Sequence, residues 1–173
     1  EKCSDFVLGR LPDAVVGGGR FEAAVIGSGW DSSMATAADL IARQCAKESK
    51  PLVVDAGALH GVREWVQAGA HVVATPHPGE AASMLLALRP ECRVARADIE
   101  TDPESYARQI ADISGAIVAL KAYRTVVAAP GGTQRVFTPP GSWGATAGAG
   151  DVLAGAIGAA LAGQAEGDLM QTV

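Results

Sequence analysis

The sequence predicts an α/β domain whose sheet is mostly parallel and ends in an antiparallel hairpin. Four short apolar runs, each closed by a polar or glycine-rich turn, alternate along the chain with segments of helical character. Strands that alternate with helices form parallel sheets joined by right-handed crossovers. Only residues 122–124 separate the fourth run from a fifth, which is too short for a crossover and suits a hairpin.

Three strands and two helices are expected in the first part of the chain. Each strand is a run of Val, Ile, Leu or Ala that stops at a polar or glycine-rich turn. These strands cover residues 23–26, 51–55 and 71–75. Residues 33–47 carry apolar side chains three or four positions apart, as an amphipathic helix does, and residues 62–68 are expected to form a short helix.

The second part of the chain is expected to hold three helices and three strands. Proline is favoured in the first turn of a helix because it has no amide hydrogen to pair, and it opens both expected helices 78–88 and 103–113. Strands are expected over residues 116–121, 125–129 and 134–138. The last helix opens in the glycine-rich segment 146–151 and runs to about residue 161.

The composition indicates one globular domain over residues 1–173 and excludes several kinds of partner. With 49% hydrophobic residues, the chain can bury a sizeable core. Its net charge of −5 is opposite in sign to a nucleic-acid-binding surface. No apolar run reaches the roughly 18 residues that a membrane span needs. The three cysteines have no metal-binding spacing, so we expect reduced thiols, no protein-bound metal site and, without a secretory signal, a cytoplasmic location.

The glycine-rich start of the last helix predicts an anion site. Without large side chains, a ligand can approach the backbone amides of Ala147, Gly148, Ala149 and Gly150, which lie where helices carry unpaired donors and partial positive charge. Asp151 would repel an anion there unless it has a chemical role. One such role is to accept the proton of an attacking hydroxyl while the amides stabilise a transferring phosphoryl group. The alternative is that Asp151 only caps the helix.

A second candidate is the segment TPHPGE at residues 75–80, which directly follows a strand. Open α/β sheets build their sites at the carboxyl ends of strands, and the two prolines leave this loop little freedom. We expect His77, Pro78, Gly79 and Glu80 to contact a substrate, with Glu80 holding another loop. The alternative is an ordinary helix-initiating turn with a surface histidine.

Three further polar residues stand at strand ends. Asp55 is expected to contact a substrate hydroxyl or organise a metal ion, unless it only caps the next helix. Lys121, which is followed by Thr125, can meet phosphate as a point charge, unless the lysine is a solvated edge residue. The Gly27-Ser28-Gly29 turn is similar to the start of a dinucleotide fingerprint, but Ser32 replaces its third glycine, so no NAD site of that kind is expected. Four of the candidate segments meet at one sheet edge.

These segments resemble, in the same order, those of the ribokinase-like NAD(P)H-hydrate dehydratases, also described as carbohydrate-kinase-like domains. The matching segments are residues 24–29, 51–59, 75–80, 119–125 and 145–155, and the resemblance covers about residues 20–163. TPHPGE is its most specific part. The resemblance implies a three-layer fold with helices on both faces of the sheet. It also implies that parts of the family domain at both ends are absent from these 173 residues.

The resemblance implies a repair enzyme for hydrated NADH and NADPH, collectively NAD(P)HX. ADP or ATP, with Mg²⁺, would phosphorylate the ring hydroxyl, and elimination of phosphate would restore NAD(P)H. By this analogy Asp151 is the base, the amides of residues 147–150 form the anion hole, and Lys121 and Thr125 lie toward the nucleotide. The resemblance further implies a homo-oligomer and a fused or partner epimerase domain.

Two other functions remain open at this stage. A ribokinase-like kinase for a vitamin precursor would use the same Asp151 and anion hole, but it would not need TPHPGE. A non-catalytic nucleotide-binding module would not need the Asp151 carboxylate, which opposes phosphate binding.

Overall fold

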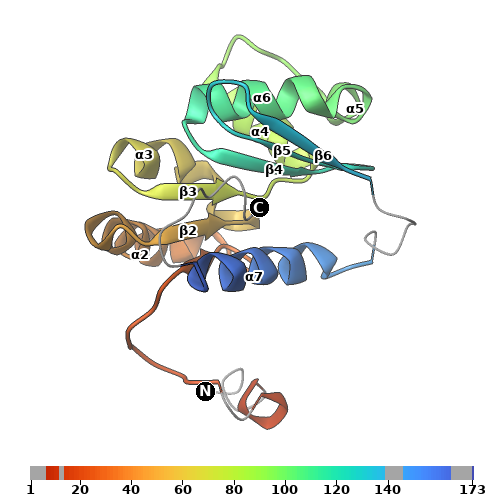
Figure 1. Cartoon of the computed structure of the whole chain (residues 1–173). Coiled ribbons are helices and arrows are strands. Elements are labelled where there is room, and N and C mark those ends of the chain that lie inside the picture. The colour runs from red at the N-terminus through yellow and green to blue at the C-terminus, as the bar shows by residue number, and fades with distance from the viewer. Residues whose placement is uncertain (1–6, 12–13, 139–145, 165–172) are drawn as a thin grey trace.

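A single mixed sheet of six strands organises the structure, a computed structural model that describes residues 7–11, 14–138, 146–164 and 173. The strands are β1 (Ala24–Ile26), β2 (Pro51–Val54), β3 (His71–Ala74), β4 (Ile117–Lys121), β5 (Thr125–Ala128) and β6 (Gln134–Phe137). They lie side by side in sequence order (Figure 1). The first four are parallel, and β5 and β6 are antiparallel to their neighbours, which confirms the predicted sheet and hairpin.

The parallel strands are almost level with one another. Ile26 pairs with Val54, Val54 with Ala74, and Ala74 with Val118. Because parallel strands in this register end at the same edge, the loops that follow β1, β2 and β3 and the last residue of β4 come together there.

Helices cover both faces of the sheet, as predicted. Since the parallel strands lie in sequence order, right-handed crossovers place every connecting helix on the same face. These elements are α2 (Ala35–Glu48), the 3₁₀ helix η2 (Ala56–Gly61), α3 (Val62–Gln67), α4 (Pro78–Leu88), α5 (Arg96–Thr101) and α6 (Pro103–Ser114). The opposite face is covered by α7 (Ala149–Ala162), which extends across β1 and β2 (Figure 1).

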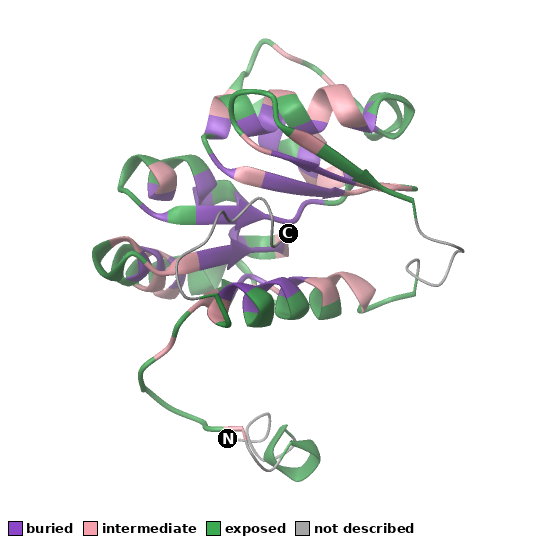
Figure 2. Ribbon diagram, in the orientation of Figure 1, coloured by how far each residue is buried: buried purple, intermediate pink, exposed green. Residues whose placement is uncertain are grey.

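The core is divided by the sheet into two parts. The larger part lies under the connecting helices and includes Leu52 and Val54 of β2. The smaller part joins Val53 of β2 to Ala154 and Ile157 of α7. Both faces of the central strands are therefore buried, as Figure 2 shows, which accounts for their unbroken valine and alanine runs.

Two elements were not predicted. Helix α5 has a single buried residue, Ile99, and so lacks the apolar periodicity that identifies a helix; Asp98 stabilises its start by accepting a hydrogen bond from the Ala95 amide at 2.8 Å. The 3₁₀ helix η2 is too short for any periodicity. The last helix begins at Ala149, within the predicted segment.

Two further observations concern the cysteines and membrane-spanning helices. Cys45 is a free thiol in the core, and burial raises its pKa to about 11, so it is held in its unreactive form. Among the described residues, no helix has both the length and the apolar character required to cross a bilayer.

Gly27 allows the end of β1 to lie against the loop that follows β2. Its φ is +105°, and a Cβ placed on it would lie 1.9 Å from the backbone oxygen of Asp55. Gly29, two residues later, also has a positive φ, +69°, but a Cβ there would meet nothing within 4 Å. The two glycines therefore separate the effect of backbone strain from that of a steric clash.

We predict that Gly27→Ala lowers the free energy of unfolding by about 3 kcal/mol or more, because strain and clash add. Gly29→Ala should cost only about 1 kcal/mol, since it carries the strain alone. Urea unfolding followed by circular dichroism measures both changes. Equal losses would contradict the close contact between the two strand ends.

Candidate active site

Backbone hydrogen bonds hold the predicted strand-end residues in one row. The Asp55 amide donates to the Ile26 carbonyl at 2.9 Å, and the Thr75 amide donates to the Val54 carbonyl at 3.0 Å. The Lys121 amide donates to the Pro76 carbonyl at 2.9 Å. Residues that lie up to 66 positions apart in the chain therefore meet at the carboxyl edge of the sheet.

The Asp55 carboxylate is the centre of this row. Its Oδ1 accepts hydrogen bonds from Lys121 Nζ and from Thr75 Oγ1, both at 2.7 Å, and its Oδ2 accepts one from Ser28 Oγ at 3.1 Å. Asp55 is only 2% exposed. Asp55 directly precedes the helix η2, but its side chain makes no capping hydrogen bond to that helix. Lys121 has a side chain that is 17% exposed and ion-paired, so it is not a solvated edge lysine.

These contacts keep Asp55 ionised. Burial alone would raise the pKa of Asp55, but the hydrogen bonds from Lys121, Thr75 and Ser28, together with the lysine charge, outweigh it. The pKa of Asp55 therefore lies below its ordinary value of 3.8.

Lys121 also reaches the first turn of α7. A Cβ placed on Gly150 would lie 3.1 Å from Lys121 Nζ, so the ammonium approaches the helix where glycine leaves room. Gly148 directly precedes the helix, and its φ of +85° is a left-handed conformation that favours glycine. The Ala149 amide donates to the Thr146 carbonyl at 3.0 Å. Within the described residues, the amides of Gly150 and Asp151 have no acceptor, as expected for a first turn.

Asp151 is exposed and lies in the first turn of α7. The start of this helix has no side-chain capping hydrogen bond, so Asp151 does not act as its cap. No hydrogen bond or ion pair links its carboxylate to another described residue, which leaves it open to a ligand. Thr125 lies directly opposite Lys121 in the β4–β5 hairpin. The helix start thus combines unpaired amides, a fixed ammonium and a free carboxylate.

His77 initiates helix α4. Its Nδ1 accepts hydrogen bonds from the amides of Gly79 and Glu80 at 3.0 and 3.2 Å. The Glu80 carboxylate accepts one from the His77 amide at 2.8 Å, which completes a capping box, and Pro78 occupies the first helical position. Since Nδ1 is an acceptor, the neutral ring carries its proton on Nε2, 3.4 Å from Glu80 Oε1. Glu80 therefore holds its own loop, and the expectation that it holds another loop is wrong.

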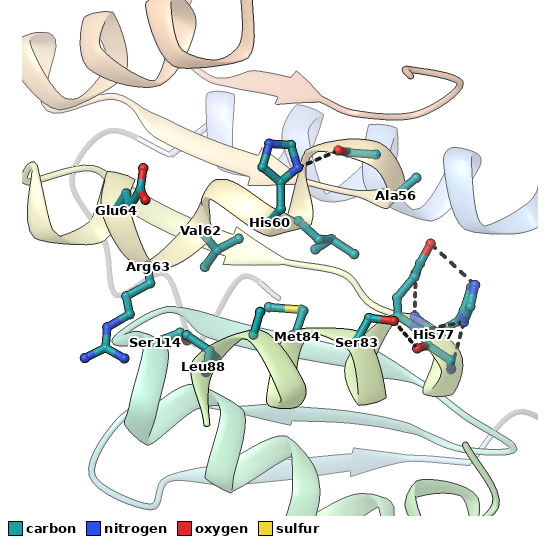
Figure 3. A pocket seen from close by; sticks show the side chains of 15 residues that line it. Ala56, His60, Val62, Arg63, Glu64, His77, Ser83, Met84, Leu88 and Ser114 are labelled. Carbon is teal, nitrogen blue, oxygen red and sulfur yellow. Dashed lines mark hydrogen bonds and ion pairs between the residues drawn. The ribbon is translucent and has the colours of Figure 1, made fainter. Parts of the chain in front are cut away.

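A cleft of about 610 Å³ begins beside this loop. One wall is formed by η2 and α3 and the other by α4 (Figure 3). His77 lies at one end, while Leu88 and Ser114 lie toward the other. Neither Lys121 nor Asp151 lines it, so the cleft and the start of α7 are separate.

Sequence reasoning missed two donors and this cleft. Ser28 and Thr75 were noted only as parts of motifs, although a hydroxyl directly after a buried strand is well placed to meet a neighbouring carboxylate. The cleft could not be foreseen, because its walls come from surface residues of separate helices with no shared pattern.

We predict that Asp55→Asn lowers the free energy of unfolding at pH 7 by about 3 kcal/mol, because it leaves a mostly buried lysine unpaired. The pKa of Asp55 is lower in the folded than in the unfolded chain, so its contribution is present at neutral pH and is lost as the pH falls through and below the ordinary value. The stability difference between wild type and variant should therefore shrink from pH 7 to roughly pH 3.

Urea unfolding at both pH values measures this difference. Glu100→Gln, which removes an exposed ion pair with Arg96, is the control and should change little at pH 7. A stability difference between wild type and Asp55→Asn that is the same at both pH values would contradict the buried pair.

Several known proteins are similar to this chain. A family model described as NAD(P)H-hydrate dehydratase matches residues 12–173. The chain is 38% identical over 165 residues to the bifunctional NAD(P)H-hydrate repair enzyme of Mycobacterium tuberculosis, covering 90% of this chain and 32% of that protein. It is 35% identical over 145 residues to the ADP-dependent (S)-NAD(P)H-hydrate dehydratase of Neisseria meningitidis serogroup B, covering 80% and 46%.

The fold is similar to that of a solved structure. The ADP/ATP-dependent NAD(P)H-hydrate dehydratase from Bacillus subtilis, co-crystallised with ATP and Mg²⁺, superposes with a TM-score of 0.79 at 24% identity, covering 99% of this chain and 63% of that one. This likeness supports the ribokinase-like three-layer fold. The chain spans about a third to a half of the length of the two relatives above. By the extent of the family match, the chain belongs to the NAD(P)H-hydrate dehydratase family.

Proposed function

We propose that this chain carries the catalytic part of an enzyme that uses ADP or ATP to convert NAD(P)HX to NAD(P)H. The observation that carries the proposal is the start of α7, where Asp151 has a free carboxylate beside unpaired amides and the Lys121 ammonium lies 3.1 Å from where a Cβ on Gly150 would be. Family membership supports the same reaction.

The residues at the start of α7 suit phosphoryl transfer followed by elimination. Asp151 accepts the proton of the substrate hydroxyl, whose oxygen attacks the terminal phosphorus of the nucleotide while the bond to the leaving nucleotide breaks. The amides of Ala147, Gly148 and Gly150 and the Lys121 ammonium hold the transferring group, with Thr125 alongside. The Ala149 amide, expected to join them, already donates to the Thr146 carbonyl. The carbon–oxygen bond to the new phosphate then breaks, the ring loses a proton, and the dihydronicotinamide is restored.

The donor set fits a nucleotide and a magnesium ion. Unpaired amides and an ammonium match phosphate oxygens, and Gly150 leaves room for close approach. Mg²⁺ in nucleotide sites is held mainly by phosphates and water, so it would accompany the nucleotide phosphates here. The described residues contain no cluster of three or more side chains suited to a metal on its own.

The substrate side is assigned to the His77 loop. His77, Pro78, Gly79 and Glu80 form a rigid helix start whose histidine side chain is 53% exposed. This loop would contact the hydrate, and the adjoining cleft offers room for a part of the substrate remote from the ring. Asp55, first expected to contact substrate as well, has a side chain only 3% exposed.

The longer protein is proposed to have further parts. A relative that is called bifunctional matches this chain over only 32% of its length, which supports a fused or partner epimerase domain. We also propose a homo-oligomer in the cytoplasm, where a soluble coenzyme would be repaired. None of these assignments requires nucleic acid or a membrane.

The test is recovery of dihydronicotinamide absorbance when NADHX is mixed with the full-length protein, Mg²⁺ and either ADP or ATP. We expect recovery only when a nucleotide is present, and the productive nucleotide identifies the phosphoryl donor. Nucleotide binding without recovery would favour the non-catalytic module, and phosphorylation of a vitamin precursor would favour the kinase.

We predict that Asp151→Asn keeps the fold and nucleotide affinity but lowers kcat by about 10²- to 10⁴-fold, because the amide cannot accept the hydroxyl proton. The same absorbance assay measures the loss, and isothermal titration calorimetry measures the affinity. Glu100→Gln, another exposed helix carboxylate, is the matched control and should keep full activity. Near-normal turnover by Asp151→Asn would refute its role as the base.

A further inference from the structure

We propose that Asp55 is a positioning residue that acts through Lys121, and not a substrate contact. It holds the lysine ammonium against the first turn of α7, where the proposed function, on which this inference rests, requires a positive charge for the transferring phosphoryl group. The buried hydroxyl of Thr75 and the half-buried hydroxyl of Ser28 hold the carboxylate in turn.

The carboxylate has no open side from which to bind a substrate. Its side chain is 3% exposed, and each oxygen already accepts a hydrogen bond from within the protein. Thr75, one of the donors, is completely buried. The donors come from three different segments that follow or end β1, β3 and β4, so the sheet itself fixes the position of Asp55.

Lys121, in contrast, has donors to spare. Its ammonium carries three hydrogens, and among the described residues Asp55 is its hydrogen-bond and ion-pair partner. The remaining hydrogens are free for a ligand at the adjoining helix start, where Nζ lies 3.1 Å from the position that a Cβ on Gly150 would occupy.

The Asp55–Lys121 ion pair, which we call the clamp, restricts the lysine side chain before a phosphate ligand binds. A lysine side chain is long and flexible, and much of its conformational freedom is lost when it is fixed. Charges that are already in place when the reaction begins stabilise a transition state without reorganisation. Asp55 supplies that fixation before any ligand arrives, which makes its effect on catalysis depend on the presence of the lysine.

A double-mutant cycle tests this dependence. Asp55→Asn, Lys121→Met and the double variant are compared with wild type for kcat and KM in the nucleotide-dependent assay. We expect Asp55→Asn to lower kcat/KM by about 10- to 100-fold when Lys121 is present. In the Lys121→Met background the same substitution should change kcat/KM by less than about threefold. If Asp55→Asn lowered kcat/KM by the same factor with and without Lys121, Asp55 would have a general structural role, and the proposal would be overturned.

Gly150→Ala perturbs the position of the ammonium without changing Asp55 or Lys121, and the same substitution in the Lys121→Met background measures its separate effect on the approach of phosphate. The added methyl carbon would lie 3.1 Å from Nζ, so it should push the ammonium away, while the backbone of α7 tolerates alanine. We expect kcat/KM to fall by about tenfold or more with an unchanged melting temperature. Gly155→Ala, on the same helix with nothing within 4 Å, is the matched control and should keep wild-type kinetics. Wild-type kinetics in both variants would overturn the contact.

Different results would overturn the clamp and the proposed function. If wild type does not restore NAD(P)H with either nucleotide, the proposed function fails, and the cycle is then measured on the affinity for ADP and ATP by calorimetry. Coupling of the two substitutions in affinity would still support the clamp, and independent effects would overturn it. Thr75→Val, which removes one donor but keeps the ion pair, provides a milder variant if Asp55→Asn does not fold.

Discussion

An ion pair between Asp55 and Lys121, 2.7 Å long and mostly closed to solvent, joins the ends of β2 and β4 across β3. Thr75, after β3, and Ser28, after β1, donate to the same carboxylate. Four parallel strands therefore share one buried polar centre at the edge where an open α/β sheet builds its site. A buried charge is tolerated only when it is paired and hydrogen-bonded, and both Asp55 and Lys121 meet that condition.

This centre divides the site into a fixed part and an open part. Burial and internal hydrogen bonds fix Asp55 and the ammonium of Lys121, whereas Asp151 and the amides at the start of α7 remain free for a ligand. Helix α7 lies on the face opposite to α4, and the two helix starts meet the sheet edge from the two sides. In the proposed reaction, the nucleotide would thus bind at α7 on one face of the sheet, and the substrate at the His77 loop before α4 on the other face.

Much of the fold could be predicted from the sequence, because strands buried on both faces appear as short valine-rich runs and the connecting helices are marked by prolines and apolar spacing. Helix α5 could not, since it buries one residue and its start depends on a single aspartate. The site residues were identified individually, but their connections were not. Nothing local in the sequence indicates that Asp55 meets Lys121, because that contact depends on the strand register and on the side-chain length of lysine. The seven residues 139–145 lie outside the described residues, so the predicted start of the 145–155 motif is described only from Thr146 onward.

The pairing of Asp55 with Lys121 can be measured directly from the carboxyl ¹³C chemical shift of Asp55 as a function of pH, in wild type and in Lys121→Met. We predict that the pKa of Asp55 lies below 3.8 in wild type. In the variant it should rise, because burial then acts without the lysine charge. The same pKa in both proteins would contradict the account, since it would mean that Lys121 does not hold the carboxylate on which the rest of the site depends.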